Sequence, residues 1–164
     1  MKASLFCVVL CSLTAIVYSF KAGAPETQCE QMRPYHGDTA PQTGKAPYVV
    51  TFSKNKIAPG ERISVRIQGV DGERFKGYMI QARVGQTPVG KFSTSNSIKL
   101  LNCGGGSSNT ATHSSPSNKA RVSLFWTAPK DLSETVHFKF TIVKDYVNYW
   151  VLQDSPKLVG FGLS

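Results

Sequence analysis

The chain has 164 residues, of which 19 are Lys or Arg and 10 are Asp or Glu, giving a formal net charge of +9 at pH 7. Its longest apolar run lies at the N-terminus and is shorter than the ~20 residues that a membrane-spanning helix requires, which excludes a membrane span. Excess positive charge on an exported chain argues against nucleic acid and favours anionic surfaces, such as bacterial envelopes, sulfated glycans or acidic lipids, although such charge can also serve solubility alone.

The N-terminus has the three parts of a secretory signal peptide. Lys2 supplies the positive charge, residues 5–17 form the apolar run, and Val17-Tyr18-Ser19 matches a cleavage site. Cleavage after Ser19 predicts a soluble, secreted, extracellular protein of residues 20–164, a length that suits one domain. Its formal net charge is +8, because Lys2 is the only charged residue removed.

Cleavage also removes two of the four cysteines. Cys29 and Cys103 remain in an oxidising compartment, where they most simply form one disulfide. In the chain-entropy model, closing a loop of this length stabilises the fold by roughly 4.5 kcal/mol. The sequence has no Cys-x-x-Cys pair, so it lacks the ligands for thiolate zinc binding and the dithiol for redox catalysis.

Residues 20–47 are interrupted by proline and glycine and contain few apolar residues, which predicts an irregular N-terminal arm tied to the domain by Cys29. Strands are predicted after this arm. The first covers Tyr48–Phe52, and the second covers Arg62–Gln68, where apolar and polar residues alternate strictly.

Phe75–Val84 is predicted to be the central strand, because alternate side chains of a strand point to opposite faces. One face carries Tyr78, Ile80, Ala82 and Val84 and is ready for a core. The other carries Gly77, Met79, Gln81 and Arg83. This mixed second face predicts a partly covered strand of an antiparallel sheet rather than a wet edge.

After a break at residues 85–88, short strands are predicted over Val89–Phe92 and Ser97–Cys103. The glycine- and serine-rich stretch 104–118 is predicted to be a loop without structure of its own, and loops of that kind tend to be functional or mobile. Three further strands are predicted, over Val122–Trp126, Val136–Val143 and Tyr149–Leu152. Seven or eight short strands without a helical window predict an all-β, antiparallel immunoglobulin-like β-sandwich, with a closed barrel as the alternative.

Several segments, in order along the mature chain, closely resemble the reeler (reelin N-terminal) domain. They are Cys29–His36, Ala58–Gly60, Phe75–Arg83, Cys103, Thr112–His113 and Phe125–Pro129. The Gln-Ala-Arg ending of the central strand is the most specific part, and Tyr78 is a mild departure, since many relatives have phenylalanine there. A signal peptide followed by one such domain is similar to the small secreted insect defence proteins of the noduler type.

The resemblance implies an immunoglobulin-like sandwich with a Cys29–Cys103 bridge. It further implies a role in innate immunity, through binding of microbial surface components or through aggregation of microbes and blood cells. Together with the basic residues, this predicts a defence protein with antimicrobial activity whose partners are lipopolysaccharide or teichoic acid. Reeler domains also occur in matrix, signalling and ferric reductase proteins, so the module alone does not fix a function. The alternative is an extracellular matrix or adhesion module without a microbial ligand.

Catalysis is not expected. No Gly-x-Ser-x-Gly elbow occurs, the histidines lack a recognisable nucleophile or carboxylate partner, and no cofactor motif is present. One metal hypothesis concerns His36 and His113, which follow the two cysteines closely enough to meet beside the disulfide. The alternative is that each histidine bonds a loop carbonyl or faces solvent, because a metal normally needs further ligands.

Basic residues on outward strand positions are the candidate ligand-binding site. The candidates are Lys54, Lys56, Arg62, Arg66 and Arg83. Phosphates and carboxylates of microbial envelopes would meet such groups in charge-assisted hydrogen bonds, strongest for arginine. Scattered cations on wet strand faces also occur without any ligand, and Arg83 has a further alternative as a partly buried member of a structural hydrogen-bond network.

Overall fold

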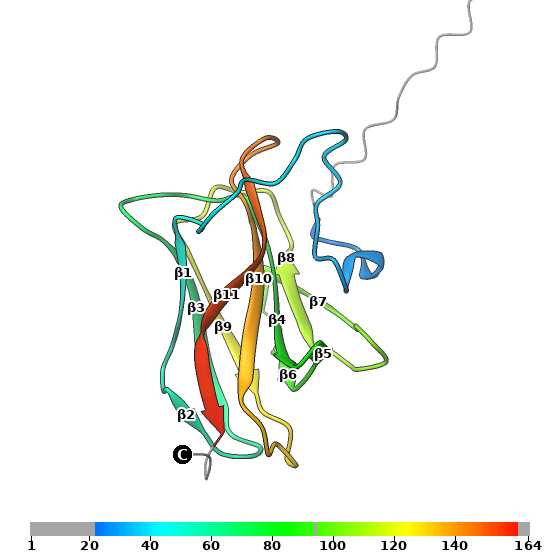
Figure 1. Cartoon of the computed structure of the whole chain (residues 1–164), viewed down its shortest axis with the longest axis vertical. Coiled ribbons are helices and arrows are strands. Elements are labelled where there is room, and N and C mark those ends of the chain that lie inside the picture. Colours follow the sequence, from blue (N-terminus) through cyan, green and yellow to red (C-terminus); the bar gives the residue numbers. More distant parts are fainter. Residues whose placement is uncertain (1–21, 94, 161–164) are drawn as a thin grey trace, which may run out of the picture.

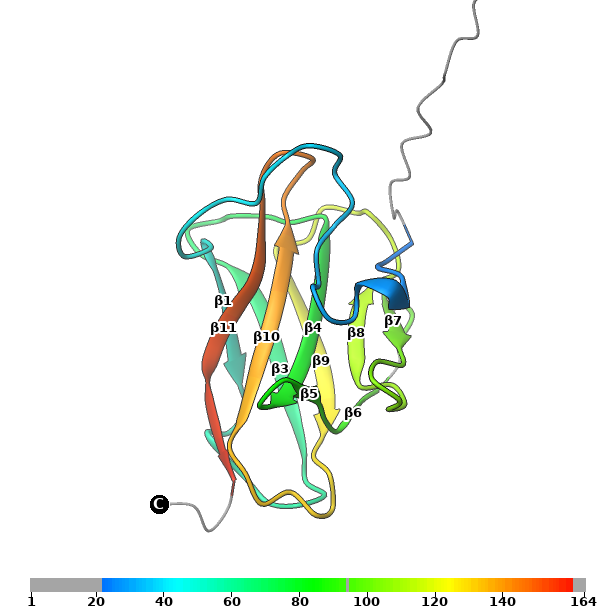
Figure 2. The same cartoon turned by 45° about the vertical axis from the view of Figure 1, so that its right-hand side comes forward.

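The computed structural model describes residues 22–93 and 95–160, so the predicted signal peptide, residues 1–19, lies outside the described residues. Two sheets stack as layers, with the N-terminal arm lying against one of them (Figures 1 and 2). Within the described ranges, no helix has the length and apolar character that crossing a bilayer would need. The two layers make the fold a β-sandwich, as predicted, and not a closed barrel.

The strand orders define the two layers. The four-stranded sheet runs β1 (Tyr48–Phe52), β3 (Arg62–Gly69), β9 (Arg121–Thr127), β6 (Lys91–Phe92). The seven-stranded sheet runs β2 (Lys56–Ile57), β11 (Tyr149–Gly160), β10 (Val136–Val143), β4 (Gly77–Val84), β8 (Thr110–His113), β7 (Ile98–Leu101), with β5 (Thr87–Pro88) paired to β4. Neighbouring strands are antiparallel except β2 and β11, which are parallel. A short 3-10 turn, η1 (Glu26–Gln28), lies in the arm.

The main core lies between the sheets and follows the predicted alternation. On β3 the apolar residues Ile63, Val65 and Ile67 are buried, while Arg62 and Arg66 are exposed. Trp126 is fully buried, its ring lies 5.2 Å from that of Phe138, and its Nε1 donates to the carbonyl of Val89 (3.1 Å). Burial of such large aromatic side chains supplies much of the apolar stabilisation of a domain this size.

A close approach of the backbone to Trp126 accounts for Gly90. This residue has a φ of +68°, and a Cβ added to it would meet the indole ring at 2.5 Å. Gly85 also has a positive φ, of +57°, but a Cβ there would meet nothing within 4 Å. Only glycine adopts such backbone angles readily, and of these two positions Gly90 is the one where the core also excludes a side chain.

Several strands differ from the predictions. β2 is not among the predicted strands, and β4, β6 and β7 are shorter than their predicted ranges. The stretch 104–118, predicted to be a loop, contains β8, and the break predicted at 85–88 contains β5. The last strand continues to Gly160 through a polar segment that includes Pro156, with bulges against β10. β8 has no apolar alternation because its small side chains are buried between β4 and β7, and β11 tolerates polar residues because much of it is half-exposed.

Candidate functional site

The N-terminal arm is fixed to the outer face of β4 by two polar side chains. Gln81 is fully buried and its Nε2 donates to the carbonyl of Cys29 (2.8 Å). Arg83 is 4% exposed, and its Nη2 donates to the carbonyls of Cys29 (3.3 Å) and Glu30 (3.2 Å). Burial lowers the pKa of the Arg83 guanidinium. Arg83 is therefore part of a structural hydrogen-bond network, the alternative that the sequence leaves open for it, and its burial leaves little of the side chain to meet a surface ligand.

The disulfide covers the same face of the sheet. Cys29 and Cys103 are bonded, with their Cα atoms 5.5 Å apart, so the predicted bridge is present. Met32 from the arm packs beside Met79, Leu101 and Cys103 in a second apolar cluster, separate from the main core. The second face of the central strand is thus buried, because the arm covers it. The sequence predicts only partial cover of this face, so the observed burial is more complete than expected.

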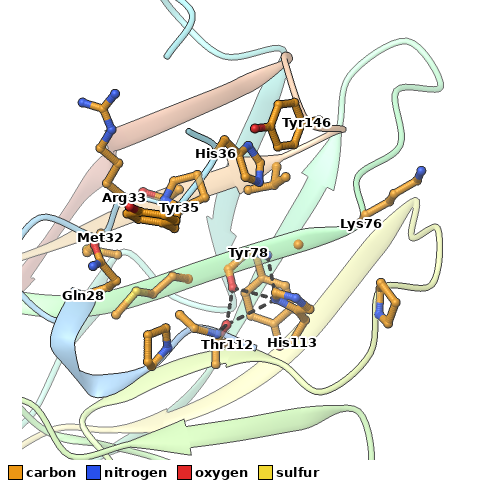
Figure 3. A pocket seen from close by; sticks show the side chains of 18 of the residues that line it. Gln28, Met32, Arg33, Tyr35, His36, Lys76, Tyr78, Thr112, His113 and Tyr146 are labelled. Atoms are coloured by element: carbon orange, nitrogen blue, oxygen red, sulfur yellow. Dashed lines mark hydrogen bonds between the residues drawn. The ribbon is translucent and has the colours of Figure 1, made fainter. Parts of the chain in front are cut away.

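Beside this cluster lies a pocket of about 210 Å³ between the arm, β4, β10 and the hairpin that joins β10 to β11 (Figure 3). We call it the arm pocket. Its floor comes from outward positions of the seven-stranded sheet, namely Gly77, Met79, Thr141 and Val143. Figure 3 shows Tyr35, His36 and Tyr146 along one side, with Thr112 and His113 along the other. Pro116 completes the lining on a loop that Lys119 holds by donating to three backbone carbonyls.

His36 belongs to an aromatic wall of the arm pocket. Its ring stacks on Tyr146, with centroids 4.8 Å apart, and meets Tyr149 edge-on at 5.0 Å. Its Nδ1 is buried without a hydrogen-bond partner among the described residues. Desolvation by burial lowers the pKa of His36, although the backbone of Tyr146 and the charge of Asp145 oppose the shift. Burial of the ring thus disfavours the charged form of His36.

His113 lines the same pocket, so the structure does bring the two predicted histidines to one site. Its Nδ1 accepts a hydrogen bond from the backbone N–H of Tyr78 (3.3 Å), and Gly77 gives the ring room, since a Cβ there would meet His113 Cε1 at 3.0 Å. Within residues 22–93 and 95–160, no group of three His, Cys, Asp or Glu side chains is arranged to hold a metal. Among the described residues, the fold therefore brings no third metal ligand to His36 and His113.

The opposite face of the sandwich carries a second candidate site, which we call the basic face. It is the outer side of the four-stranded sheet and includes the exposed residues Arg62, Arg66, Lys91, Arg121 and Phe125. Strand register places Arg62, Thr127 and Lys91 side by side in one row across the sheet. Ser64 and Phe125 form the next outward row, and Arg66 and Ser123 form the row after that. The Arg62 guanidinium lies 4.2 Å from the centre of the half-exposed Phe125 ring, a cation–π contact.

The basic face has no charge of the opposite sign on its strands. The sequences of β1, β3, β9 and β6 contain no Asp or Glu. The two predicted residues Arg62 and Arg66 are thus joined by Lys91 and Arg121, which sequence reasoning missed. Pairing of β3, β9 and β6 brings these four residues to a common face. The sequence signal that could have revealed Lys91 and Arg121 is their position next to a strand residue that packs in the core, Phe92 and Val122 respectively, because neighbouring side chains of a strand point to opposite faces.

Lys54 and Lys56 do not join the basic face. Lys54 forms an ion pair with Glu61, a carboxyl whose pKa is lowered first by the hydrogen bond from the Ala58 N–H and then by Lys54. Lys56 lies on β2, at the edge of the other sheet, opposite Val159. The predicted cationic set is therefore divided by the fold, with Arg62 and Arg66 together and the other three residues elsewhere.

The fold matches that of a solved domain, and a family model matches the sequence. The reeler domain of human F-spondin superposes with a TM-score of 0.61 at 18% identity, over 74% of this chain and 94% of that domain. The Reeler domain family model matches residues 27–160. The chain belongs to the Reeler domain family, as the sequence resemblance predicts.

Relatives of full length occur among insects. "Putative defense protein 3" of Antheraea mylitta is 38% identical over 148 residues, covering 89% of this chain and 90% of that protein. A Bombyx mori protein with the name "Putative defense protein" is 34% identical and covers 91% of each chain. The protein named "Putative ferric-chelate reductase 1 homolog" of Drosophila melanogaster is 39% identical over 141 residues, but these make up only 22% of that protein. Homology over the whole length therefore connects this chain with the insect defence proteins.

Proposed function

We propose that this protein is a secreted, non-enzymatic defence protein that binds anionic components of microbial surfaces through the basic face. The observation that carries the proposal is the clustering of four exposed cations around Phe125 on strands without acidic residues. Full-length homology to insect proteins named for defence supports the biological role. The predicted signal peptide and the disulfide both suit an extracellular site of action.

The chemistry of the basic face suits phosphate and carboxylate groups. Arginine guanidinium groups donate paired hydrogen bonds to such oxyanions, and a sheet holds several of them at fixed spacing. Along one strand, Arg62 and Arg66 lie four residues apart on the same face, about 13 Å from each other in an extended chain. A ligand with repeated anionic groups, such as lipopolysaccharide or teichoic acid, could engage both cations at once. Multivalent contact of this kind strengthens binding without any new type of interaction.

The test is binding of the mature protein to immobilised lipopolysaccharide and teichoic acid at physiological salt, which screens non-specific attraction. Arg62→Ala/Arg66→Ala should weaken binding about tenfold, because each exposed charge contact contributes up to about 1 kcal/mol. The matched control, Lys130→Ala/Lys157→Ala, removes the same net charge from exposed positions outside the basic face and should bind like the wild type.

Equal loss in both double variants would show that net charge alone drives binding and would refute the assignment to the basic face. Absence of binding by the wild type to either polymer would refute the microbial ligand and leave the matrix or adhesion role. Blood-cell surfaces, the other predicted partner, are tested by adding the same variants to haemocytes and scoring aggregation.

A further inference from the structure

We infer that the arm pocket is a binding site for a small amphipathic anion, a molecule with a short apolar chain or one ring and a carboxylate or phosphate head. The site is independent of the proposed microbial binding, because it lies on the outer side of the seven-stranded sheet while the basic face lies on the other layer. Its size, its lining and the charges at its rim each point to this chemistry.

Size limits the apolar part of the ligand. The pocket volume of about 210 Å³ exceeds the ~150 Å³ of an engineered cavity that binds benzene. It falls below the ~300–1,000 Å³ of pockets that enclose drug-sized ligands. A chain of about eight carbons or a single substituted ring fits this range, whereas a complete multi-chain lipid does not.

The interior of the arm pocket is apolar. Met32 and Met79 are 1% and 3% exposed, and their flexible thioethers adapt to ligands of irregular shape. Val143 from β10 and Pro34 from the arm add further apolar surface. Such a lining favours hydrocarbon over a hydrated ligand, because the hydrocarbon leaves water while the apolar lining has little hydration to give up.

Two tyrosines flank the opening. Tyr35 is 64% exposed and Tyr146 is 48% exposed, although both are large aromatic side chains that line the pocket. The stack of Tyr146 on His36 holds its ring in place. A tyrosine presents an apolar ring together with a hydroxyl at its tip, so the pair suits the boundary between the chain and the head group of an amphipathic ligand.

Charges at the rim select the sign of the head group. Arg33 and Lys76 lie on opposite sides of the pocket (Figure 3). Within the described residues the Lys76 ammonium makes no ion pair or hydrogen bond, and Arg33 makes one hydrogen bond, to the carbonyl of Thr39 (3.2 Å). The one carboxylate in the lining, Asp145, already accepts hydrogen bonds from Val147 and Asn148. Free cationic donors therefore outnumber free anionic acceptors at the opening.

The sequence supplies reporters for the test. The chain has three methionines, and Met32 and Met79, the two that remain after removal of the predicted signal peptide, both line the arm pocket. We would label the mature protein with 13C at the methionine methyl groups and titrate it with octanoate by NMR. Octylammonium, which has the same chain with a cationic head, is the matched ligand control. Octanoate should shift both methyl signals saturably, and octylammonium should bind at least about threefold more weakly.

Two variants complete the design. Lys76→Glu changes an exposed side chain and should weaken octanoate binding about fivefold. Lys130→Glu, in the loop between β9 and β10, should not. That loop lies at the end of the sandwich away from the arm (Figure 1). Val143→Phe fills the pocket and should abolish the methionine shifts while thermal unfolding verifies that the variant is folded. Unresponsive methionine signals, equal affinity for octylammonium, or octanoate binding that depends on Arg62 and Arg66 instead of Lys76 would overturn the inference.

Discussion

Replacing Arg83 by methionine should destabilise the protein by about 2–4 kcal/mol, although the substitution keeps most of the apolar stem. The guanidinium donates to Gln81 Oε1 (2.7 Å), to Gln86 Oε1 (3.2 Å) and to the carbonyls of Cys29 and Glu30. The side-chain amide of Gln86 and the backbone carbonyl of Glu30 belong to exposed residues and can accept hydrogen bonds from water instead. The decisive loss is at Gln81, which is fully buried.

Without Arg83, the side-chain oxygen Oε1 of Gln81 would lose the only hydrogen bond found for it among the described residues. A buried acceptor left without a donor costs about 1–3 kcal/mol. The lost bonds to the arm add about 1 kcal/mol. Arg83→Lys should fall between the variant and the wild type, because one ammonium cannot reproduce the fork of donors.

Urea unfolding followed by tryptophan fluorescence measures the effect, since Trp126 lies in the main core. Arg121→Met, at an exposed position on β9, is the control and should change the free energy of unfolding by less than about 0.5 kcal/mol. If Arg83→Met were as stable as this control, Arg83 would not hold the arm. The structural role also requires that folded Arg83→Met binds lipopolysaccharide as the wild type does.

Three further predictions concern stability. Replacing Cys29 and Cys103 by serine should lower the free energy of unfolding by up to about 4.5 kcal/mol, and a loss below about 1 kcal/mol in urea would contradict a stabilising bridge. Gly90→Ala should cost more than about 2 kcal/mol by forcing a Cβ into a buried indole, whereas Gly85→Ala, also at positive φ, should cost only about 1 kcal/mol; equal thermal shifts would refute the clash. Burial and then the charge of Glu73 raise the pKa of Tyr48 to about 12, so its contribution is complete below pH 10 and is lost as the pH rises towards 12. Tyr48→Phe should flatten that part of the stability profile, and an unchanged profile would contradict the shift.

The sequence predicts the main core well because one physical rule governs it. Where a strand has one buried and one exposed face, its apolar residues alternate, as in β3 and β10. The predicted range of β1 is also the observed one. β8 was missed because it is covered on both sides, so small residues such as Thr110 and Ala111 replace the alternating large ones.

The sites depend on contacts between distant parts of the chain, and these leave a weaker signal. Arg83 looks like a surface cation from β4 alone, and only the arm, more than fifty residues earlier, buries it. The arm pocket needs the arm, β4, β10 and the hairpin after β10 together. The disulfide does predict that the arm returns to mid-domain, which is why the proximity of His36 and His113 could be anticipated while the surrounding aromatic wall could not.

The most direct test of the account is co-sedimentation of the mature protein with washed bacterial cells at physiological salt. The account predicts that the wild type and the charge-matched control Lys130→Glu/Lys157→Glu sediment with the cells, and that Arg62→Glu/Arg66→Glu stays in the supernatant while unfolding at the wild-type temperature. Sedimentation of the folded Arg62→Glu/Arg66→Glu variant to the same extent as the wild type would contradict it.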